Sequence, residues 1–406
     1  MLKLRRAIVL DAGLPGSAGE QNLVIELRAA DGAGAVLDAV RPAIADVALV
    51  GRAEVGDDLV VNVQARDLGL GSGGFDIVHV NLSRGLAGEG AASANVMKLN
   101  YTSLQHTVEP VEEFLPAELP VGPLERPVAV LALHGQLAPV AWAFAQVLPG
   151  SRLGYVQTEG GALPGGHSRT VRLLRERGLL AGHLTAGAAF GGEGEAVTTV
   201  GALHHGLRNL GWDAALCGPG PGIVGSSSPL GHGGMSALDS AHAALALGVP
   251  TLVVARMSSG DPRARHRGIS HHTLTVLDLL LEPVTVALPA GVRSPVGADL
   301  RAGLGAVFAG ALPRLPPRNR PALELDVERP ARITRHDWRR ASVDLPAYAA
   351  TNLPAETMGR RLVEDPLFFG AALAAGATLA ELTGDADRGE DGAGETEQPV
   401  APSRSL

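Results

Sequence analysis

The sequence is poor in cysteine and in aromatic residues, and its net charge is not basic. Cys217 is the only cysteine among 406 residues, which excludes a disulfide framework and a thiolate zinc site. Aromatic residues make up 3% of the chain, so the core must pack mainly on aliphatic side chains. The net charge of −8 argues against a general nucleic-acid binder, which needs a basic domain or stripe.

Long apolar runs are scarce as well. No uninterrupted run reaches the roughly 18 to 20 residues of a membrane span. Near the amino terminus, Asp11 interrupts the apolar stretch and no small-residue cleavage site follows, so no signal peptide is expected. The composition therefore predicts a soluble, cytoplasmic globular protein that has neither a membrane nor a nucleic acid as partner. The length favours two domains with appendages.

Residues 1–105 show strand patterns and little helix. Short apolar stretches separated by Gly, Pro and Asp are typical of a small antiparallel β-barrel of the OB or SH3 kind. We expect strands at residues 6–10, 22–28, 48–50, 59–64, 75–82 and 97–101. Five prolines in the following part of the chain predict a linker at residues 106–127.

Residues 128–312 change to short apolar runs that alternate with longer amphipathic stretches. This pattern predicts an α/β domain with a doubly wound, mostly parallel sheet, which is a Rossmann-like architecture. Gly178, Gly211 and Gly248 each separate an expected helix from the next strand, where a left-handed cap needs no Cβ atom. The expected strands are 128–133, 153–157, 182–185, 214–217, 251–255 and 284–288. The expected helices are 138–147, 168–177, 196–210, 236–247 and 270–280.

The remainder of the chain has a weaker pattern. Residues 313–383 are expected to form a partly helical extension packed on the α/β domain, with a helix at 355–382 that breaks at Asp365-Pro366. A further helix at 296–312 and a strand at 323–327 are expected. The arginine-rich stretch from Arg329 to Arg340 fits a solvated face or an anchor for the tail. Residues 384–406 are acidic and poor in apolar residues, so they are expected to be disordered.

Glycine-rich loops follow several of the expected strands. In a doubly wound sheet these loops meet at the carboxyl edge, where ligands bind. Glycine allows backbone N–H groups to approach a ligand, so an anionic small molecule would fit. The alternative is that each glycine only allows a tight turn between a strand and the following helix. The chain has no dinucleotide, P-loop or nucleophile-elbow motif in the required context, and no motif identifies a cofactor. The candidate ligand-binding glycines are Gly160, Gly161, Gly191, Gly192, Gly218 and Gly220.

The densest polar segment is residues 261–272, which follow the fifth strand of this domain. Arg263 and Arg265 alternate along an extended stretch and could grip a carboxylate or phosphate, with Ser270 at the helix amino terminus beside them. His266 and His271 are the candidate catalytic residues for proton transfer. Asp261 would orient one of these histidines. A solvated surface loop would show the same composition.

Metal binding is not predicted from the spacing of the histidines. His271 and His272 diverge by about 100° on a helix, so one ion would rarely take both. His266 with one of them, and His232 or Asp261, could form a site in space, but capping and hydrogen-bonding roles are favoured. Cys217 ends an apolar strand and is expected to be a buried, inert thiol.

Several strings of residues resemble a known family. They are 97–102 (MKLNYT), 155–169 (YVQTEGGALPGGHSR), 190–193 (FGGE), 261–273 (DPRARHRGISHHT), 357–360 (TMGR) and 364–366 (EDP). Together they look like the uncharacterised bacterial family known as domain of unknown function 3866, over nearly the whole chain up to about Gly376. The resemblance supports the domain layout and implies no activity and no catalytic residue.

Two functions fit these observations. The first is an enzyme of unassigned reaction, or a related binding protein, that holds a small anionic ligand at the carboxyl edge of the sheet. The alternative is a noncatalytic regulatory or assembly protein that binds a partner through the β domain and the C-terminal region. The oligomeric state is left open by the sequence.

Overall fold

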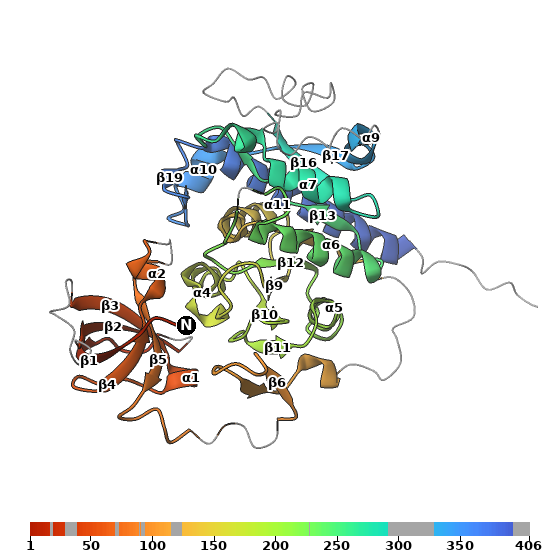
Figure 1. The fold of residues 1–406 in the computed structure, drawn as a ribbon. Coiled ribbons are helices and arrows are strands. Elements are labelled where there is room, and N and C mark those ends of the chain that lie inside the picture. The colour runs from red at the N-terminus through yellow and green to blue at the C-terminus, as the bar shows by residue number, and fades with distance from the viewer. Residues whose placement is uncertain are drawn as a thin grey trace, which may run out of the picture.

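The structure is a computed structural model, in which a small barrel lies beside a larger α/β unit (Figure 1). It describes the chain except for residues 17–18, 29–38, 70–72, 89, 91–93, 115–123, 227, 291–328 and 393–406. The helix expected at 296–312 and the strand expected at 323–327 lie outside the described residues. The fold class predicted from the sequence is confirmed, with a closed barrel followed by a parallel sheet that helices cover.

The amino-terminal domain is a closed five-stranded barrel with the strand order β1-β2-β3-β5-β4. Neighbouring strands are antiparallel except for β3 and β5, and this order is that of the OB-fold. Fully buried Ile25, Leu59 and Val61 fill its interior. The strands are β1 (Leu4–Ala12), β2 (Glu20–Leu27), β3 (Val40–Asp46), β4 (Asp58–Asn62) and β5 (Asp76–Asn81).

Two local predictions in the barrel were wrong. The expected strand at 48–50 is a short helix, α1 (Val47–Val50), because the Asp46 carboxylate accepts a hydrogen bond from the Ala48 N–H and caps it. Strand β3 was not expected. A second short helix, α2 (Gln64–Asp67), follows β4.

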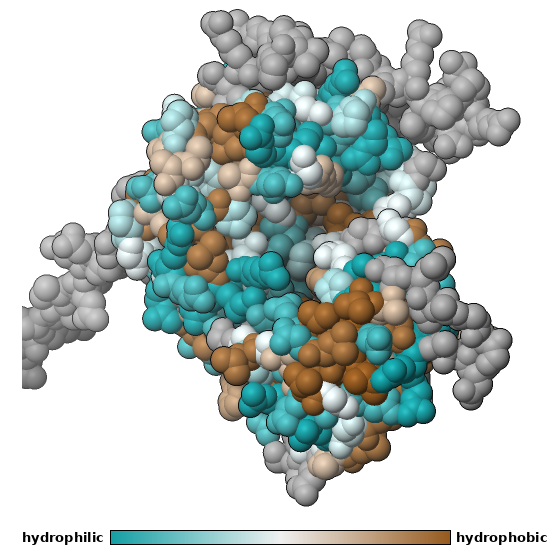
Figure 2. Space-filling model, turned by 90° about the vertical axis from the view of Figure 1, so that its left-hand side faces the viewer, coloured by the Kyte–Doolittle hydropathy of each residue, from teal (hydrophilic) through white to brown (hydrophobic). Residues whose placement is uncertain are grey.

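One outer face of the barrel is apolar. Val24 on β2, Val40 on β3 and Ile77 on β5 are at least one-third exposed, and these three strands are consecutive in the barrel. Figure 2 shows a hydrophobic patch over the barrel on this side of the molecule. The barrel contacts the α/β unit elsewhere, where Arg172 forms a 2.6 Å salt bridge with Glu20.

The α/β unit is built on eight strands, and every neighbouring pair is parallel. The strand order is β11-β10-β9-β12-β8-β13-β16-β17. All six expected strands are present, whereas β11 and β17 at the two edges were not expected. The strands are β8 (Val128–Val130), β9 (Leu153–Thr158), β10 (Gly182–Ala186), β11 (Gly194–Ala196), β12 (Ala214–Pro219), β13 (Thr251–Val253), β16 (Thr285–Ala290) and β17 (Asp337–Ser342).

Helices cover both faces of this sheet, because successive residues of each central strand are buried on opposite sides. One face packs against α3 (Leu137–Val147), α4 (Arg169–Glu176) and α11 (Pro366–Gly392). The other packs against α5 (Thr199–His204), α6 (Ser236–Ala246) and α7 (His271–Leu279). The glycines expected to cap three helices have φ angles of 66°, 64° and 70°. Cys217 is buried between the layers, as expected, and burial raises the pKa of its thiol to about 12.

The segment 96–114 lies along the edge of the sheet. It contains the antiparallel pair β6 (Val96–Lys98) and β7 (His106–Val108), followed by the 3-10 helix η1 (Val111–Phe114). Lys98 is buried and donates a 2.6 Å hydrogen bond to the carboxylate of Glu195, the middle residue of β11. This contact fixes β6 to the last strand of the sheet.

The C-terminal part differs from its prediction at both ends of the long helix. Residues 356–361 form a hairpin of β18 (Glu356–Thr357) and β19 (Arg360–Arg361), so α11 starts only at Pro366. The helix continues to Gly392, past the expected boundary at 384. The arginine-rich stretch forms α9 (Arg329–Thr334) and β17, and Arg335 and Arg340 are exposed, as a solvated face requires; α10 (Leu345–Ala349) follows.

Helix α11 is long and apolar enough over Pro366–Ala386 to span a membrane by length and composition. However, 83% of its most apolar window is buried inside the molecule. It packs chiefly against α3, and Phe369, Ala372 and Leu379 are fully or almost fully buried. These contacts are those of a core helix in a soluble globular protein.

Candidate functional site

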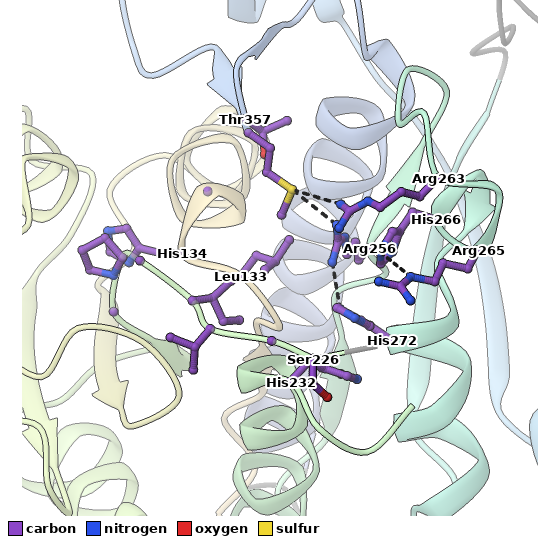
Figure 3. Close-up of a pocket in the computed structure, with 18 of the residues that line it drawn as sticks. Leu133, His134, Ser226, His232, Arg256, Arg263, Arg265, His266, His272 and Thr357 are labelled. Atoms are coloured by element: carbon purple, nitrogen blue, oxygen red, sulfur yellow. Dashed lines mark hydrogen bonds between the residues drawn. The ribbon is translucent and has the colours of Figure 1, made fainter. Parts of the chain in front are cut away.

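A cavity of about 730 Å³ opens at the carboxyl ends of β8, β12 and β13 (Figure 3). Its walls come from the loops after these strands, from the segment before α7 and from the β18–β19 hairpin. The cavity is lined by Leu133, His134, Gly135, Gly220, Pro221, Gly222, Ile223, Val224, Gly225, Ser226, His232, Arg256, Arg263, Arg265, His266, His272, Glu356, Thr357 and Met358.

The fully buried Asp261 organises three arginines at one end of the cavity. Its carboxylate accepts two hydrogen bonds from Arg263, at 2.9 and 2.8 Å. Guanidinium nitrogens of Arg256 and Arg360 lie 3.7 and 3.6 Å from the same carboxylate. Burial alone would raise the pKa of Asp261, but the hydrogen bonds and the charge of Arg263 outweigh it and hold that pKa well below its usual range. Asp261 is therefore a permanent anion beneath a cationic wall.

A second buried carboxylate, Asp365, ties the start of α11 to this wall. It accepts hydrogen bonds from the Ser258 hydroxyl at 2.6 Å, from the Ser259 N–H at 2.7 Å and from Arg360 Nε at 3.0 Å. Arg360 thus bridges Asp261 and Asp365. As a result, two segments far apart in the sequence form one unit at the cavity.

The β18–β19 hairpin places a sulfur atom over the arginines. Met358 and Gly359 form its two-residue turn, with φ angles of 47° and 73°. The Met358 Sδ atom lies 3.4 Å from Arg256 Nη2 and 3.9 Å from Arg263 Nη2. A positive φ at methionine is strained, and such strain is concentrated at functional sites.

Four imidazole rings gather beside the arginines. The rings of His232 and His272 are stacked with centroids 3.4 Å apart, and the His271 ring lies 4.4 Å from His272. His266 lies 4.9 Å from both His271 and His272. His232 precedes the 3-10 helix η5 (Gly233–Met235), and His266 ends another, η6 (Ala264–His266), whereas His271 and His272 begin α7.

The hydrogen bonds of two histidines fix where their lone pairs lie. Arg256 Nη1 donates to His272 Nδ1 at 2.8 Å, so that nitrogen carries no proton. Arg265 Nε lies 3.4 Å from His266 Nε2 and donates to it, and His266 Nδ1 lies 2.8 Å from the Ser270 hydroxyl oxygen. Ser270 also caps α7, because its oxygen accepts from the His272 N–H.

All four histidines are held neutral. Burial and the charges of Arg256 and Arg263 lower the pKa of His266 to about 3. Burial and Arg265 lower the pKa of His271 to about 4. Burial, followed by nearby arginines, also lowers the pKa values of His232 and His272. Neutral imidazoles offer lone pairs to a proton, a ligand or a metal.

The opposite wall contains a second polar network around His134. His134 Nε2 lies 2.8 Å from the Ser168 hydroxyl oxygen, and its Nδ1 lies 3.5 Å from the Tyr155 hydroxyl. The Tyr155 ring stacks on His183. Burial lowers the pKa of His134 to about 4, so this end of the cavity carries no charge from His134 at neutral pH.

The structure brings together only part of the predicted site. Arg263, Arg265, His266 and Gly220 line the cavity, and His271 lies in the histidine cluster behind it. Asp261 hydrogen-bonds to Arg263, whereas Ser270 is the partner of His266 Nδ1.

The predicted glycines divide into two groups. A Cβ atom at Gly160 or Gly161 would meet Gly233 or Gly220, so this loop supports the cavity wall. Gly218 packs on Leu131, beneath the same wall. Gly191 and Gly192 lie outside the cavity lining, beside Gly166 and Thr185, where the Gly191 N–H donates to Glu195.

Several residues of the site were not selected from the sequence. Arg256 and His134 lie in the loops just after β13 and β8, a position that favours ligand contact in this fold, but each is the only charged or titratable residue in its local stretch. Met358, Arg360 and Asp365 lie in strings that carry the family resemblance. The family resemblance was the one signal in the sequence that could have selected these three residues, because no local sequence pattern connects them to residues 256–272.

A family model described as protein of unknown function (DUF3866) matches residues 42–376, which is more than half of the chain. The matched region contains all the residues that line the cavity. No curated protein and no solved structure matches the chain.

Proposed function

Because the chain belongs to the family of proteins of unknown function DUF3866, whose description names no ligand, we propose a function from the site alone: the protein binds a small organic anion in the cavity. The observation that carries this proposal is the charge of the lining. Arg256, Arg263 and Arg265 face the cavity, and Glu356 is the only acidic residue among the lining residues that the structure describes. A cavity with this excess of guanidinium groups attracts a phosphate or a carboxylate.

Arg265 is the residue best placed to hold the anion. Arg263 is already paired with Asp261, and Arg256 donates to His272. Arg265 forms no salt bridge with any carboxylate in the described part of the chain, and its guanidinium points toward the cavity in Figure 3. A bound anion would give this cation a partner and two parallel hydrogen bonds.

The remaining lining suits the organic part of such a ligand. Leu133, Ile223 and Met358 provide apolar surface between the arginines and His134. A ligand with an anionic group at one end and an apolar or neutral polar body at the other would contact both. His266 stays our candidate for proton transfer to or from the ligand, since it lines the cavity and its Nε2 becomes free to accept a proton once Arg265 turns from it to the anion.

Calorimetric titration with inorganic phosphate, pyrophosphate and small dicarboxylates tests the proposal, together with mass spectrometry of metabolites retained by the protein. We expect Arg265→Ala to weaken anion binding about 10- to 100-fold, the range of one charge-assisted hydrogen bond or a bidentate pair. Arg267→Ala is the matched control, because Arg267 donates to the Asp261 carbonyl and does not line the cavity. Equal affinities of the two variants would refute the proposal.

The apolar face of the barrel favours a second function, the binding of a protein partner. Val24, Val40 and Ile77 form this face, and such exposed patches often mark interaction sites. A partner that copurifies with the wild-type protein should be lost in Ile77→Asp and retained in Leu86→Asp, which changes an exposed leucine outside the three strands. Retention of the partner by both variants would exclude this apolar face as its binding site.

A further inference from the structure

We propose that His232, His271 and His272 bind one Zn²⁺ ion at the wall of the cavity. Each of the three residues offers a ligand atom, and these atoms all lie within 4.8 Å of one another. Three histidines with a fourth position left for water or substrate are a common arrangement at catalytic zinc sites. This inference goes beyond the anion site and does not depend on it.

Several imidazole nitrogens of this cluster lack a hydrogen-bond partner among the described residues. His232 is 7% exposed, yet neither of its nitrogens has a hydrogen-bond partner among the described residues. The same is true of His271 Nε2. A buried polar atom without a partner typically costs about 1–3 kcal/mol, so the fold maintains this arrangement at the expense of stability. A metal ion would satisfy these nitrogens.

The hydrogen bonding of His272 also leaves a lone pair for a metal. Arg256 Nη1 can only donate to His272 Nδ1, so that nitrogen carries no proton that a metal would have to displace. Imidazole suits zinc and other late first-row metals, whereas Mg²⁺ and Ca²⁺ require oxygen ligands. Since the three residues of the group are all histidines, the composition selects zinc over the alkaline-earth ions.

His272 connects the metal to the arginines. Its unprotonated nitrogen, Nδ1, now accepts from Arg256. A metal that takes this lone pair displaces the Arg256 guanidinium. Arg256 would then be available for an anion in the fourth coordination position, because His232, His272 and Arg256 all line the cavity. The charge of the ion and of the guanidinium would be offset by that anion.

Binding requires one ring to turn. His232 and His272 are stacked with an interplanar angle of 11°, whereas two imidazoles on one ion each direct a nitrogen toward it within the ring plane. Turning the His232 ring would break its stacking on His272 but no hydrogen bond within the described chain. His271 and His272 are adjacent in α7, and their spacing alone predicts that one ion would rarely take both. Their ring centroids nevertheless lie 4.4 Å apart, close enough for one ion to reach both rings.

The test uses metal alone, added to full-length protein that has been treated with a chelator and then freed of it. We expect one equivalent of Zn²⁺ by elemental analysis after gel filtration, and with Co²⁺ the visible absorption bands of a four-coordinate site. His232→Ala and His271→Ala should each lower the metal affinity more than 100-fold. His242→Ala is the matched control, because His242 lies on α6 and accepts a hydrogen bond from the Leu281 N–H, outside the cluster.

Absence of stoichiometric metal, or metal binding that His232→Ala leaves unchanged, would overturn the proposal. Should His271→Ala fail to fold, His232→Ala decides, because His232 lies in a loop and its ring makes no hydrogen bond within the described chain. Failure here is distinguishable from failure of the proposed function. Arg265→Ala is expected to weaken anion binding while leaving the Zn²⁺ stoichiometry at one.

Discussion

The Asp365 carboxylate accepts a 2.6 Å hydrogen bond from the Ser258 hydroxyl, which joins the start of α11 to the loop that carries the cavity arginines. Both groups are buried, and Arg360 adds a third link between the same two segments. Helix α11 is the central helix on one face of the sheet, so the cavity is anchored directly to the core. Stability and ligand binding should therefore change together when this link is altered.

Asp365→Asn should destabilise the protein by about 3 kcal/mol, since it leaves Arg360 with Asp261 as its only remaining carboxylate within the described chain and places an NH₂ group among N–H and O–H donors. Denaturant unfolding measures the loss, and anion titration should show weaker binding. Glu364→Gln is the control, because Glu364 is half-exposed and bonds only to Arg361 among the described residues. A change below 1 kcal/mol in Asp365→Asn would contradict the anchoring role.

Met358→Gly should raise stability and weaken anion binding. Glycine adopts a φ near 47° without strain, so relief of the strained turn is expected to contribute about 1 kcal/mol. The same change removes the sulfur that contacts Arg256 and Arg263. Thermal unfolding and calorimetry measure the two effects. Asparagine tolerates a positive φ better than most other residues, so the melting temperature of Met358→Asn should lie between those of the wild-type protein and Met358→Gly. A melting temperature of Met358→Gly below that of the wild-type protein would refute the strain.

The sequence was sufficient to predict six of the eight strands and the helices between them, because buried parallel strands are apolar on both sides and these helices are amphipathic. Strand β17 escaped this reasoning, since its sequence, DWRRAS, is largely polar and it lies at an edge with one neighbour. Strand β11 has three residues, too few for a pattern. Edge and short strands depend on pairing with a neighbour rather than on their own composition.

The candidate site was predictable only where its residues are close in sequence. Arg263, Arg265 and His266 share one segment, and their charge density was visible. His134 and Arg256 follow β8 and β13, which are neighbours in the sheet, and Asp365 reaches the site from the carboxyl terminus. Their proximity depends on the strand order and on the docking of α11. Neither is encoded by local periodicity.

Stability should decrease as the pH falls from 6.5, in part because of His183. Burial, with smaller contributions from His134 and Arg175, lowers the pKa of His183 to about 3 in the folded protein. An unfolded histidine titrates near pH 6.5, so the unfolded state binds more protons between these values and gains stability as the pH falls. At pH 5 this difference in proton binding by His183 lowers the free energy of unfolding by about 2 kcal/mol.

His183→Phe keeps a ring against Tyr155 and removes the titrating group. The loss of unfolding free energy between pH 7 and pH 5 should therefore be smaller in the variant by about 2 kcal/mol. Urea unfolding at the two pH values measures it. An identical pH dependence in both proteins would show that His183 is protonated in the folded state at pH 5.

Lys98→Met should destabilise the protein by about 3–5 kcal/mol, because it leaves the partly buried Glu195 carboxylate without its cation. Lys98 also donates to the carbonyl oxygens of Thr185 and Ala189, so the variant loses the contact that holds β6 to the end of β10. Lys98→Met combined with Glu195→Gln should recover part of the loss, since no unpaired charge remains.

Arg339→Ala is the comparison for this variant, because Arg339 pairs with Asp337 on the surface and such exposed pairs contribute about 1 kcal/mol or less. We would compare the unfolding free energies of the wild-type protein, Lys98→Met, the double variant with Glu195→Gln, and Arg339→Ala. The comparison distinguishes the contribution of a buried ion pair from that of an exposed pair on the same sheet. If Lys98→Met were as mild as Arg339→Ala, the Lys98–Glu195 pair would not be what fixes β6 to the sheet.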